Sequence, residues 1–264
     1  MTTHTLRNPA RDRLEAGELA LGVGIRQSRH VSIARTMKTA GFDFLFLDME
    51  HSTLSLDTVG QISVAALDAG IAPLVRVPEL DHQRAARALG DGALGVVMPN
   101  VHNADEARAI AASHRYPPLG NRTSGGPLVH FGFDNVPADE AHKMVNDATL
   151  IAVMIERQAT VEQAESIAAV EGVDVVMLGV GDLTADLGIS GQPGHDDIVA
   201  AFETVGAACR KHGKWLGMGG VGTPELMAKY IDMGARFVLT GGETGLLIAA
   251  GRRRCEDLRE VLGS

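Results

Sequence analysis

The sequence has 264 residues, of which 45% are hydrophobic and 22% are charged, with a formal net charge of −9. This size and composition predict one large folded core rather than two small ones. The negative charge and the lack of Lys/Arg-rich runs argue against nucleic acid and anionic membrane surfaces as partners. No apolar run approaches the ~20 residues that a membrane-spanning helix requires.

The amino-terminal region and the cysteines bear on location. Residues 1–20 contain Asp, Glu and Arg where a secretory signal would need an apolar stretch. The only cysteines, Cys209 and Cys255, are far apart in the sequence. We therefore expect a reducing, cytoplasmic location.

Short apolar runs of strand length alternate along the chain with longer segments whose apolar residues recur at helical spacing. The predicted strands are residues 19–25, 42–47, 72–77, 95–98, 150–155, 173–178, 215–218 and 237–240. Residues 55–70, 160–170 and 223–235 are among the predicted helical segments. Eight strand–helix pairs predict the α/β class and a single-domain (β/α)₈ barrel over residues 1–264, with a doubly wound sheet as the alternative.

Local signals support the helix starts. Asn103 with Glu106, and Thr160 with Gln163, have the spacing of capping boxes. Pro224 follows Thr223 at a predicted first helical position.

Residues 116–148 interrupt the alternation, because they have no clean period and are rich in Gly, Pro and Asn. A connection this long inside a compact domain is usually functional. We expect a lid or an oligomer contact, and an unrecognised helix is the alternative explanation.

The residues that follow the predicted strands carry the candidate chemistry, because barrels of this kind place active sites at the carboxyl ends of their strands. Glu156 and Asp182 follow neighbouring strands and form an oxygen-rich pair that suits Mg²⁺ or Mn²⁺. Each acid taken alone could equally be an ordinary partner of Lys or Arg. Their joint position at adjacent strand ends favours a metal site with coordination positions open to substrate or water.

Arg76 and His51 also follow predicted strands. The fixed fork of donors on Arg76 suits a carboxylate or an enolate oxygen, but a salt bridge to Asp48 or Glu50 is nearly as plausible. His51 could be a metal ligand, a general base or a surface histidine, and spacing does not choose between these roles.

Six stretches of the sequence are informative together: "AGFDFLFLDMEHS", "PLVRVP", "GVVMPNVHNADEARAIAASHRYPPLGNR", "VMIE", "VEGVDVVMLGVGDLTADLG" and "MGARFVLTGGETGLL". The resemblance that they carry is to the HpcH/HpaI family of metal-dependent, class II pyruvate aldolases. It covers roughly residues 15 to 255 in order, which is more specific than any single motif.

The resemblance implies a role for each matching position. The metal ligands match Glu156 and Asp182, and the catalytic histidine matches His51. The arginine that contacts the keto or enolate oxygen of pyruvate matches Arg76. The remaining matches are the supporting acids Asp48 and Glu50 and the backbone amides that hold the pyruvate carboxylate, at Gly181 and Asp182.

The implied activity is the reversible retro-aldol cleavage of a 4-hydroxy-2-oxo acid, such as 4-hydroxy-2-oxoheptanedioate. The products would be an aldehyde and pyruvate, or a related 2-oxo acid such as hydroxypyruvate, formed through a metal-bound enolate. The implied cofactor is Mg²⁺ or Mn²⁺, with Co²⁺ or Zn²⁺ as further options, and the implied assembly is a homo-oligomer, a hexamer or a trimer.

The sequence departs from the family pattern in several places, two of which concern single side chains of the site. An Asp that pairs with the catalytic histidine in typical members is replaced by Gly90, with Asp91 one step on as a candidate substitute. A Gln two residues before the metal-ligand Glu is replaced by Met154.

Three alternative functions remain open at this level. The same site could decarboxylate oxaloacetate to give the same enolate. The glycines of "GMGGVG" and "LTGGETG" could bind phosphate in a metal-free isomerase or synthase. A non-catalytic oligomeric binding protein is the third.

Overall fold

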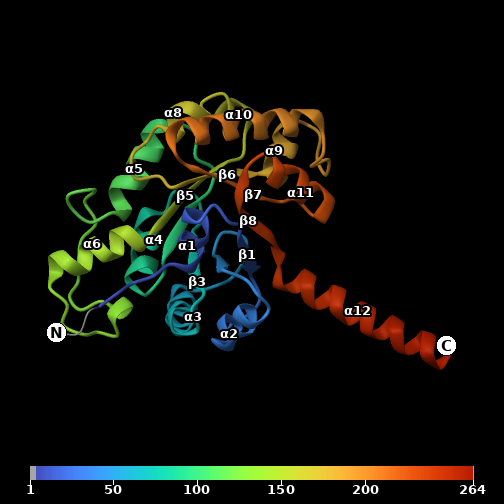
Figure 1. Ribbon diagram of the computed structural model, residues 1–264, viewed down its shortest axis with the longest axis horizontal. Coiled ribbons are helices and arrows are strands. Elements are labelled where there is room, and N and C mark those ends of the chain that lie inside the picture. Colours follow the sequence, from blue (N-terminus) through green and yellow to red (C-terminus); the bar gives the residue numbers. More distant parts are fainter. Residues whose placement is uncertain (1–3, 264) are drawn as a thin grey trace.

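The computed structural model describes residues 4–263, which form a closed barrel of eight parallel strands (Figure 1). The strands are β1 (Ala20–Ile25), β2 (Phe44–Asp48), β3 (Ala72–Arg76), β4 (Gly95–Met98), β5 (Leu150–Ile155), β6 (Val175–Gly179), β7 (Trp215–Gly219) and β8 (Ala235–Gly242). Each strand pairs with the next, and β8 pairs with β1. The predicted (β/α)₈ barrel is confirmed, and the doubly wound alternative is wrong because the sheet has no open edge.

Helices connect the strands and surround them. They are α1 (Pro9–Glu15), α2 (Ser32–Thr39), α3 (Leu56–Ala69), α4 (His82–Gly90), α5 (Ala104–His114), η1 (Val129–Phe131), α6 (Ala138–Ala148), α7 (Gln158–Val161), α8 (Ala164–Ala168), α9 (Val180–Asp186), α10 (Asp196–His212), α11 (Pro224–Asp232) and α12 (Glu243–Leu262).

Two of the expected helix starts are confirmed and one is wrong. The Asn103 side chain accepts a hydrogen bond from the Glu106 amide at 2.9 Å, and Pro224 begins α11. Thr160 is not an N-cap, because it lies inside the short helix α7, which ends at Val161. The next helix, α8, begins at Ala164 and has Gln163 as its N-cap residue.

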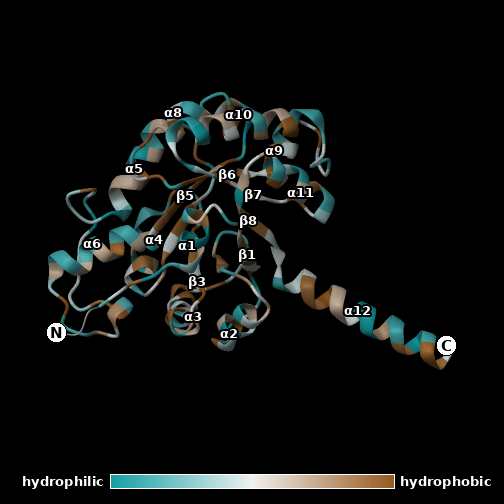
Figure 2. Ribbon diagram, viewed as in Figure 1, coloured by the Kyte–Doolittle hydropathy of each residue, from teal (hydrophilic) through white to brown (hydrophobic). Residues whose placement is uncertain are grey.

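Alternate residues of each strand point into the barrel. On β5, Leu150, Ala152 and Met154 belong to the inner core, whereas Ile151 and Val153 pack under the surrounding helices. Strands covered on both sides read as continuous apolar runs, which is why they stand out as hydrophobic in Figure 2. The inward positions at the carboxyl ends are the ones that can carry polar groups to the mouth of the barrel.

Aromatic rings fill part of the interior. Phe44 of β2 stacks on Phe237 of β8, with ring centroids 4.4 Å apart. A Cβ atom on Gly22 would lie only 2.0 Å from the Phe44 ring, so β1 needs glycine there to admit this side chain.

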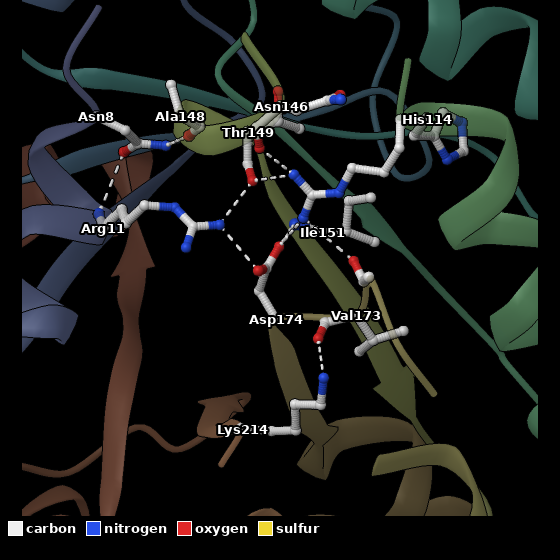
Figure 3. Close-up of polar contacts among 12 residues, drawn as sticks. Asn8, Arg11, His114, Asn146, Ala148, Thr149, Ile151, Val173, Asp174 and Lys214 are labelled. Atoms are coloured by element: carbon white, nitrogen blue, oxygen red, sulfur yellow. Dashed lines mark hydrogen bonds and ion pairs between the residues drawn. The ribbon is translucent and has the colours of Figure 1, made fainter. Parts of the chain in front are cut away.

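A buried ionic cluster lies at the amino-terminal end of β5 and β6 (Figure 3). The Asp174 carboxylate accepts hydrogen bonds from Arg11 at 2.8 Å, from Arg115 at 2.6 Å and from the Ile151 amide at 2.7 Å. Both guanidinium groups also donate to the Thr149 carbonyl oxygen. The cluster thus ties α1 and the α5–β5 connection to the start of two strands.

Residues 116–148 lie at this same end of the barrel, because they connect the end of α5 to the start of β5. They contain η1 and α6, so the alternative of an unrecognised helix is correct for part of the segment. Within the described chain this segment does not cover the candidate site, which lies at the opposite end of the barrel, so the lid stays a prediction. The oligomer contact stays a prediction.

Helix α12 leaves the barrel after β8 and extends away from it (Figure 1). Glu243 is its only buried residue, whereas Leu247, Val261 and Leu262 are 70%, 84% and 78% exposed. Figure 2 shows hydrophobic segments along this projecting helix. Among residues 4–263, no helix combines the length and apolar character needed to cross a membrane.

Asp174→Asn is expected to lower the free energy of unfolding by ~3–5 kcal/mol, because it leaves two largely buried guanidinium groups without their counterion. Urea denaturation would measure this change. Asp105→Asn is the control, since the Asp105–Arg108 pair is exposed and should contribute less than ~1 kcal/mol. Equal effects of the two substitutions would contradict the proposed importance of the cluster.

Candidate functional site

The carboxyl ends of β2, β4, β5 and β6 meet around a surface pocket. Its lining residues are Glu50, His51, Asn100, Glu156, Arg157, Asp182 and Asp186. Four of the predicted site residues, namely Glu50, His51, Glu156 and Asp182, are therefore brought together. Arg76 and Asp48 lie directly behind Glu50.

Asp48 and Arg76 form a two-pronged ion pair across β2 and β3, where they are register partners. Arg76 Nε donates to Asp48 Oδ1 at 3.0 Å, and Arg76 Nη2 donates to Asp48 Oδ2 at 2.7 Å. Asp48 is fully buried and also accepts from Arg26 Nε at 2.7 Å. Burial by itself raises the pKa of Asp48, but the bonds and charge of Arg76 outweigh it, so the pKa lies below its ordinary value.

The same carboxylate shapes the loop that follows β2. Asp48 Oδ1 accepts from the amides of Glu50 and His51 at 3.1 and 3.2 Å. Glu50 Oε2 lies 3.0 Å from Arg76 Nη1 and 3.6 Å from His51 Nε2. The salt bridge alternative for Arg76 is thus observed with both acids, and His51 is held at the pocket with its ring about half exposed.

Glu156 continues the inward alternation of β5 and is only 6% exposed. Its Oε2 accepts a hydrogen bond from the backbone N–H of Asn100 at 2.6 Å. A Cβ atom on Gly179 would lie only 2.6 Å from its Oε1. Burial raises the pKa of Glu156 to about 7; the Asn100 amide opposes this rise, and the nearby Asp182 and Glu50 add to it. Because its ionised form is disfavoured here, the Glu156 carboxylate would be stabilised by a positive group beside it.

Asp182 lies in the first turn of α9 and lines the pocket, and both it and the preceding Gly181 are exposed. Gly220, in the loop after β7, approaches closely: it has φ +83, and a Cβ on it would lie 2.7 Å from the Gly181 nitrogen. Only glycine suits this backbone and this distance. The chain therefore leaves room over the Gly181 backbone.

A second pocket lies at the same carboxyl-terminal end of the barrel. It is lined by Asp48 and Arg26, by Phe46 and Leu239 from inside the barrel, and by glycines of β1, of the end of β8 and of the loop after β7. Arg26, which binds Asp48, therefore places a positive charge at the wall of this pocket.

Three residues of the site were not predicted. Glu243 is 2% exposed, and its Oε1 accepts from the amides of Arg26, Gln27 and Ser28 at 2.8, 2.6 and 3.1 Å. Asn100 has φ 52 and presents its amide to Glu156. Arg26 was not predicted either, although it directly follows the first predicted strand. Glu243 could have been noticed, because it lies in the "GGETG" stretch at the end of the eighth predicted strand.

Asp91 and Met154 lie elsewhere. Asp91 caps α4 just before β4, at the amino-terminal end of the barrel, and touches the backbone side of Gly60 rather than His51. Its expected place beside His51 is therefore not found within one chain. Met154 is 4% exposed and belongs to the inner core, so an apolar side chain lies where an amide was expected.

The donor set suits a hard divalent cation. Carboxylate oxygens are the ligands such cations prefer, and Glu156 has the elevated pKa expected of a buried acid beside other acids. Within residues 4–263 no three His, Cys, Asp or Glu side chains are gathered as a ready ligand group. Two protein ligands would therefore need oxygen atoms from substrate or water to complete the coordination.

Comparisons with known proteins show the family of the chain. A model of the HpcH/HpaI aldolase/citrate lyase family matches residues 26–250. A 4-hydroxy-4-methyl-2-oxoglutarate aldolase of Hapsidospora irregularis is 37% identical over 252 residues, which are 94% of this chain and 93% of that protein. A 4-hydroxy-2-oxo-heptane-1,7-dioate aldolase of Salmonella paratyphi C is 35% identical over 242 residues, 92% of this chain and 91% of that one.

A solved structure gives the same answer for the fold. The crystal structure of an HpcH/HpaI aldolase from Desulfitobacterium hafniense superimposes with a TM-score of 0.90 at 30% identity, covering 97% of this chain and 98% of the other. The match spans the barrel and the elements that carry the pocket. The chain belongs to the HpcH/HpaI aldolase/citrate lyase family of carbon–carbon lyases.

Proposed function

We propose that the protein is a divalent-metal-dependent aldolase that cleaves a 4-hydroxy-2-oxo acid reversibly to a 2-oxo acid and an aldehyde. The observation that carries the proposal is Glu156, a buried carboxylate with a raised pKa that faces Asp182 in an open pocket. The family generally depends on a divalent metal, and the named relatives are aldolases of 4-hydroxy-2-oxo acids.

Glu156 and Asp182 are the proposed metal ligands, with Mg²⁺ or Mn²⁺ as the preferred ions and Co²⁺ or Zn²⁺ as further options. Gly179 leaves the space that the Glu156 carboxylate occupies, which supports a fixed ligand. When bound, the cation supplies Lewis-acid polarisation of the 2-oxo group.

Arg76 is the proposed partner of the developing oxyanion. Two of the five N–H donors of an arginine are used on Asp48, and Nη1 forms an ion pair with Glu50, so donors remain for a substrate oxygen. The two acids hold the guanidinium in one place before substrate arrives. A fixed donor of this kind stabilises charge without reorganisation.

His51 is the proposed proton carrier. Its ring is 52% exposed on the pocket side, and its Nε2 lies 3.6 Å from Glu50 Oε2. Glu50, whose pKa is raised by burial, is placed to orient the ring in place of the missing family Asp. In cleavage, His51 would take the proton of the substrate 4-hydroxyl group.

The two pockets at this end of the barrel are the proposed places for the two parts of the substrate. The exposed backbone at Gly181 and Asp182, at the start of α9, is the proposed rest for the carboxylate of pyruvate or hydroxypyruvate. The pocket of Arg26 and the glycine loops is the proposed space for the aldehyde fragment. Because both relatives are named for dicarboxylic substrates, a second carboxylate close to Arg26 is consistent with this arrangement.

Oxaloacetate decarboxylation is a second candidate for the same site, because loss of carbon dioxide gives the same enolate. A metal-free phosphate-binding isomerase or synthase is favoured only by the glycine-rich pocket beside Arg26. Survival of activity in EDTA would discriminate that alternative.

We further propose a cytoplasmic homo-oligomer, a hexamer or a trimer. The support is α12, whose apolar residues are exposed well away from the barrel. A helix of this kind is normally covered, and a second copy of the chain is the proposed cover.

Glu156→Gln and Asp182→Asn are expected to lower the metal-dependent release of pyruvate from a 4-hydroxy-2-oxo acid by more than ~10²-fold, because Lewis-acid stabilisation contributes several kcal/mol. A coupled pyruvate assay with and without EDTA, run beside carbon dioxide release from oxaloacetate, measures this. The exposed Glu162→Gln serves as the control. Full activity of either pocket variant would refute the metal assignment.

Glu156 also gives a prediction that needs no turnover. Its pKa rises from 4.5 to about 7 on folding, so its favourable contribution is present below pH 4.5 and is lost as pH rises through about 7. In EDTA, Glu156→Gln should therefore gain ~3 kcal/mol of stability over the parent protein across this interval. Denaturant unfolding at several pH values would show it, and saturating Mn²⁺ should stabilise only the parent. Parallel pH curves for parent and variant would contradict it.

Light scattering should find a trimer or hexamer. Leu247→Glu, on the exposed face of α12, should shift the population toward smaller species, because a charge in a covered apolar contact is costly. Val31→Glu, at an exposed apolar position just before α2, is the control and should leave the mass unchanged. A monomeric parent protein would contradict the proposal.

A further inference from the structure

Arg26 has more hydrogen-bond donors than its own chain uses. Its Nε donates to Asp48 Oδ2 at 2.7 Å, and this is the only side-chain hydrogen bond or ion pair of Arg26 among residues 4–263. An arginine has five N–H donors, so those on both Nη atoms remain. The side chain is 48% exposed and lines the glycine-rich pocket at the mouth of the barrel. These donors are therefore available to a ligand in that pocket.

Asp48 does not depend on Arg26 for its pairing. Both of its carboxylate oxygens accept hydrogen bonds from Arg76, and Oδ1 also accepts from the amides of Glu50 and His51. The buried acid thus has a counterion and several donors without Arg26. A partner for Asp48 is therefore not a sufficient reason for an arginine at position 26.

The protein holds Arg26 at both ends of the residue. Its backbone N–H donates to Glu243 Oε1 at 2.8 Å, and the same oxygen accepts from the next two amides, of Gln27 and Ser28. The bond from Nε to the buried Asp48 fixes the guanidinium. A donor group that is already in place loses less conformational entropy when a ligand binds.

Arg29, on the same loop, has its donors turned to the protein. Its Nη1 donates to the Arg26 carbonyl oxygen at 2.9 Å, and its Nη2 donates to Thr53 Oγ1 at 2.9 Å. It does not line the glycine-rich pocket. Two exposed arginines of one loop therefore differ, since only Arg26 faces the pocket with unused donors.

Arg26 is the only cation among the described residues that line this pocket. The other lining residues are Asp48, three apolar side chains and several glycines. The pocket at the ends of β2, β4, β5 and β6 has acids in its wall, namely Glu50, Glu156, Asp182 and Asp186. A second negative group of the substrate would be repelled by those acids and attracted by Arg26.

The distance between Arg26 and Arg76 limits where such a group lies on the substrate. Arg26 Nε and Arg76 Nη2 both bind the same atom, Asp48 Oδ2, at 2.7 Å. The two nitrogen atoms therefore lie no further apart than twice this distance. With Arg76 beside the oxygen on C2, a carboxylate attached directly to C4 is close enough for Arg26, whereas further methylene groups would carry it away.

We propose that Arg26 is a specificity-determining residue, which binds a carboxylate carried on C4 of the substrate. The inference rests on the proposed aldolase function and adds the class of the second product, which is itself a 2-oxo acid, such as glyoxylate. In cleavage, the 4-hydroxyl group loses its proton and becomes the carbonyl of this product as the C3–C4 bond breaks. The enolate left behind takes up a proton to give pyruvate. Arginine suits the role because its planar fork matches a carboxylate.

The test is the addition of pyruvate to three aldehydes, in the presence of Mn²⁺, with kcat/KM measured for each aldehyde. Glyoxylate has its carboxylate next to the carbonyl, acetaldehyde has none, and succinic semialdehyde has it two methylene groups further away. Arg26→Met should lower the value for glyoxylate ~10- to 100-fold relative to both other aldehydes, the usual loss when a hydrogen bond to a charged group is removed. The change should lie mainly in KM.

Two further variants separate recognition from a structural defect. Arg26→Lys keeps a charge beside Asp48 but loses the fork, so its ratios should fall between those of the parent and Arg26→Met. Arg29→Met removes the neighbouring arginine of the same loop and should keep the ratios of the parent.

The outcomes distinguish this inference from the proposed function. Unchanged ratios in Arg26→Met, a larger loss with succinic semialdehyde than with glyoxylate, or a parent protein that uses acetaldehyde but not glyoxylate would each overturn the role of Arg26 while the aldolase proposal stands. A parent protein that adds pyruvate to none of the three aldehydes would refute both.

Discussion

The ion pair between Asp48 and Arg76 is the interaction on which the mouth of the barrel depends. It joins the ends of two neighbouring strands, and Arg26 extends it to a third. The same Asp48 carboxylate binds the amides that position Glu50 and His51. Because Asp48 is fully buried, these groups cannot move independently, and one carboxylate sets the geometry of several candidate functional side chains.

Strand alternation explains why much of this could be predicted. Asp48, Arg76 and Glu156 each occupy the next inward position after a series of buried apolar residues on β2, β3 and β5. When an apolar strand ends in an ionisable residue at an inward-facing position, that residue is expected at the mouth of the barrel. The eight strands were predicted for the same reason, with only their ends displaced by a residue or two.

The features that were not predicted depend on contacts between distant segments. Glu243 is bound by amides more than two hundred residues earlier in the chain, and Asn100 meets Glu156 through an unusual backbone angle. Thr160 has the spacing of a cap, but it lies within a short helix whose position is set by packing against α10. Residues 116–148 have a helix without clean periodicity, since only α6 and a few neighbours share a small separate core.

Glu243 is also the first residue of α12, the helix that points away from the barrel. The Glu243 carboxylate therefore connects the start of this 20-residue helix to the loop that carries Arg26. Three backbone amides, of Arg26, Gln27 and Ser28, make this connection. A protein surface that binds α12 is thereby connected, through Glu243, to the Arg26 loop at the mouth of the barrel.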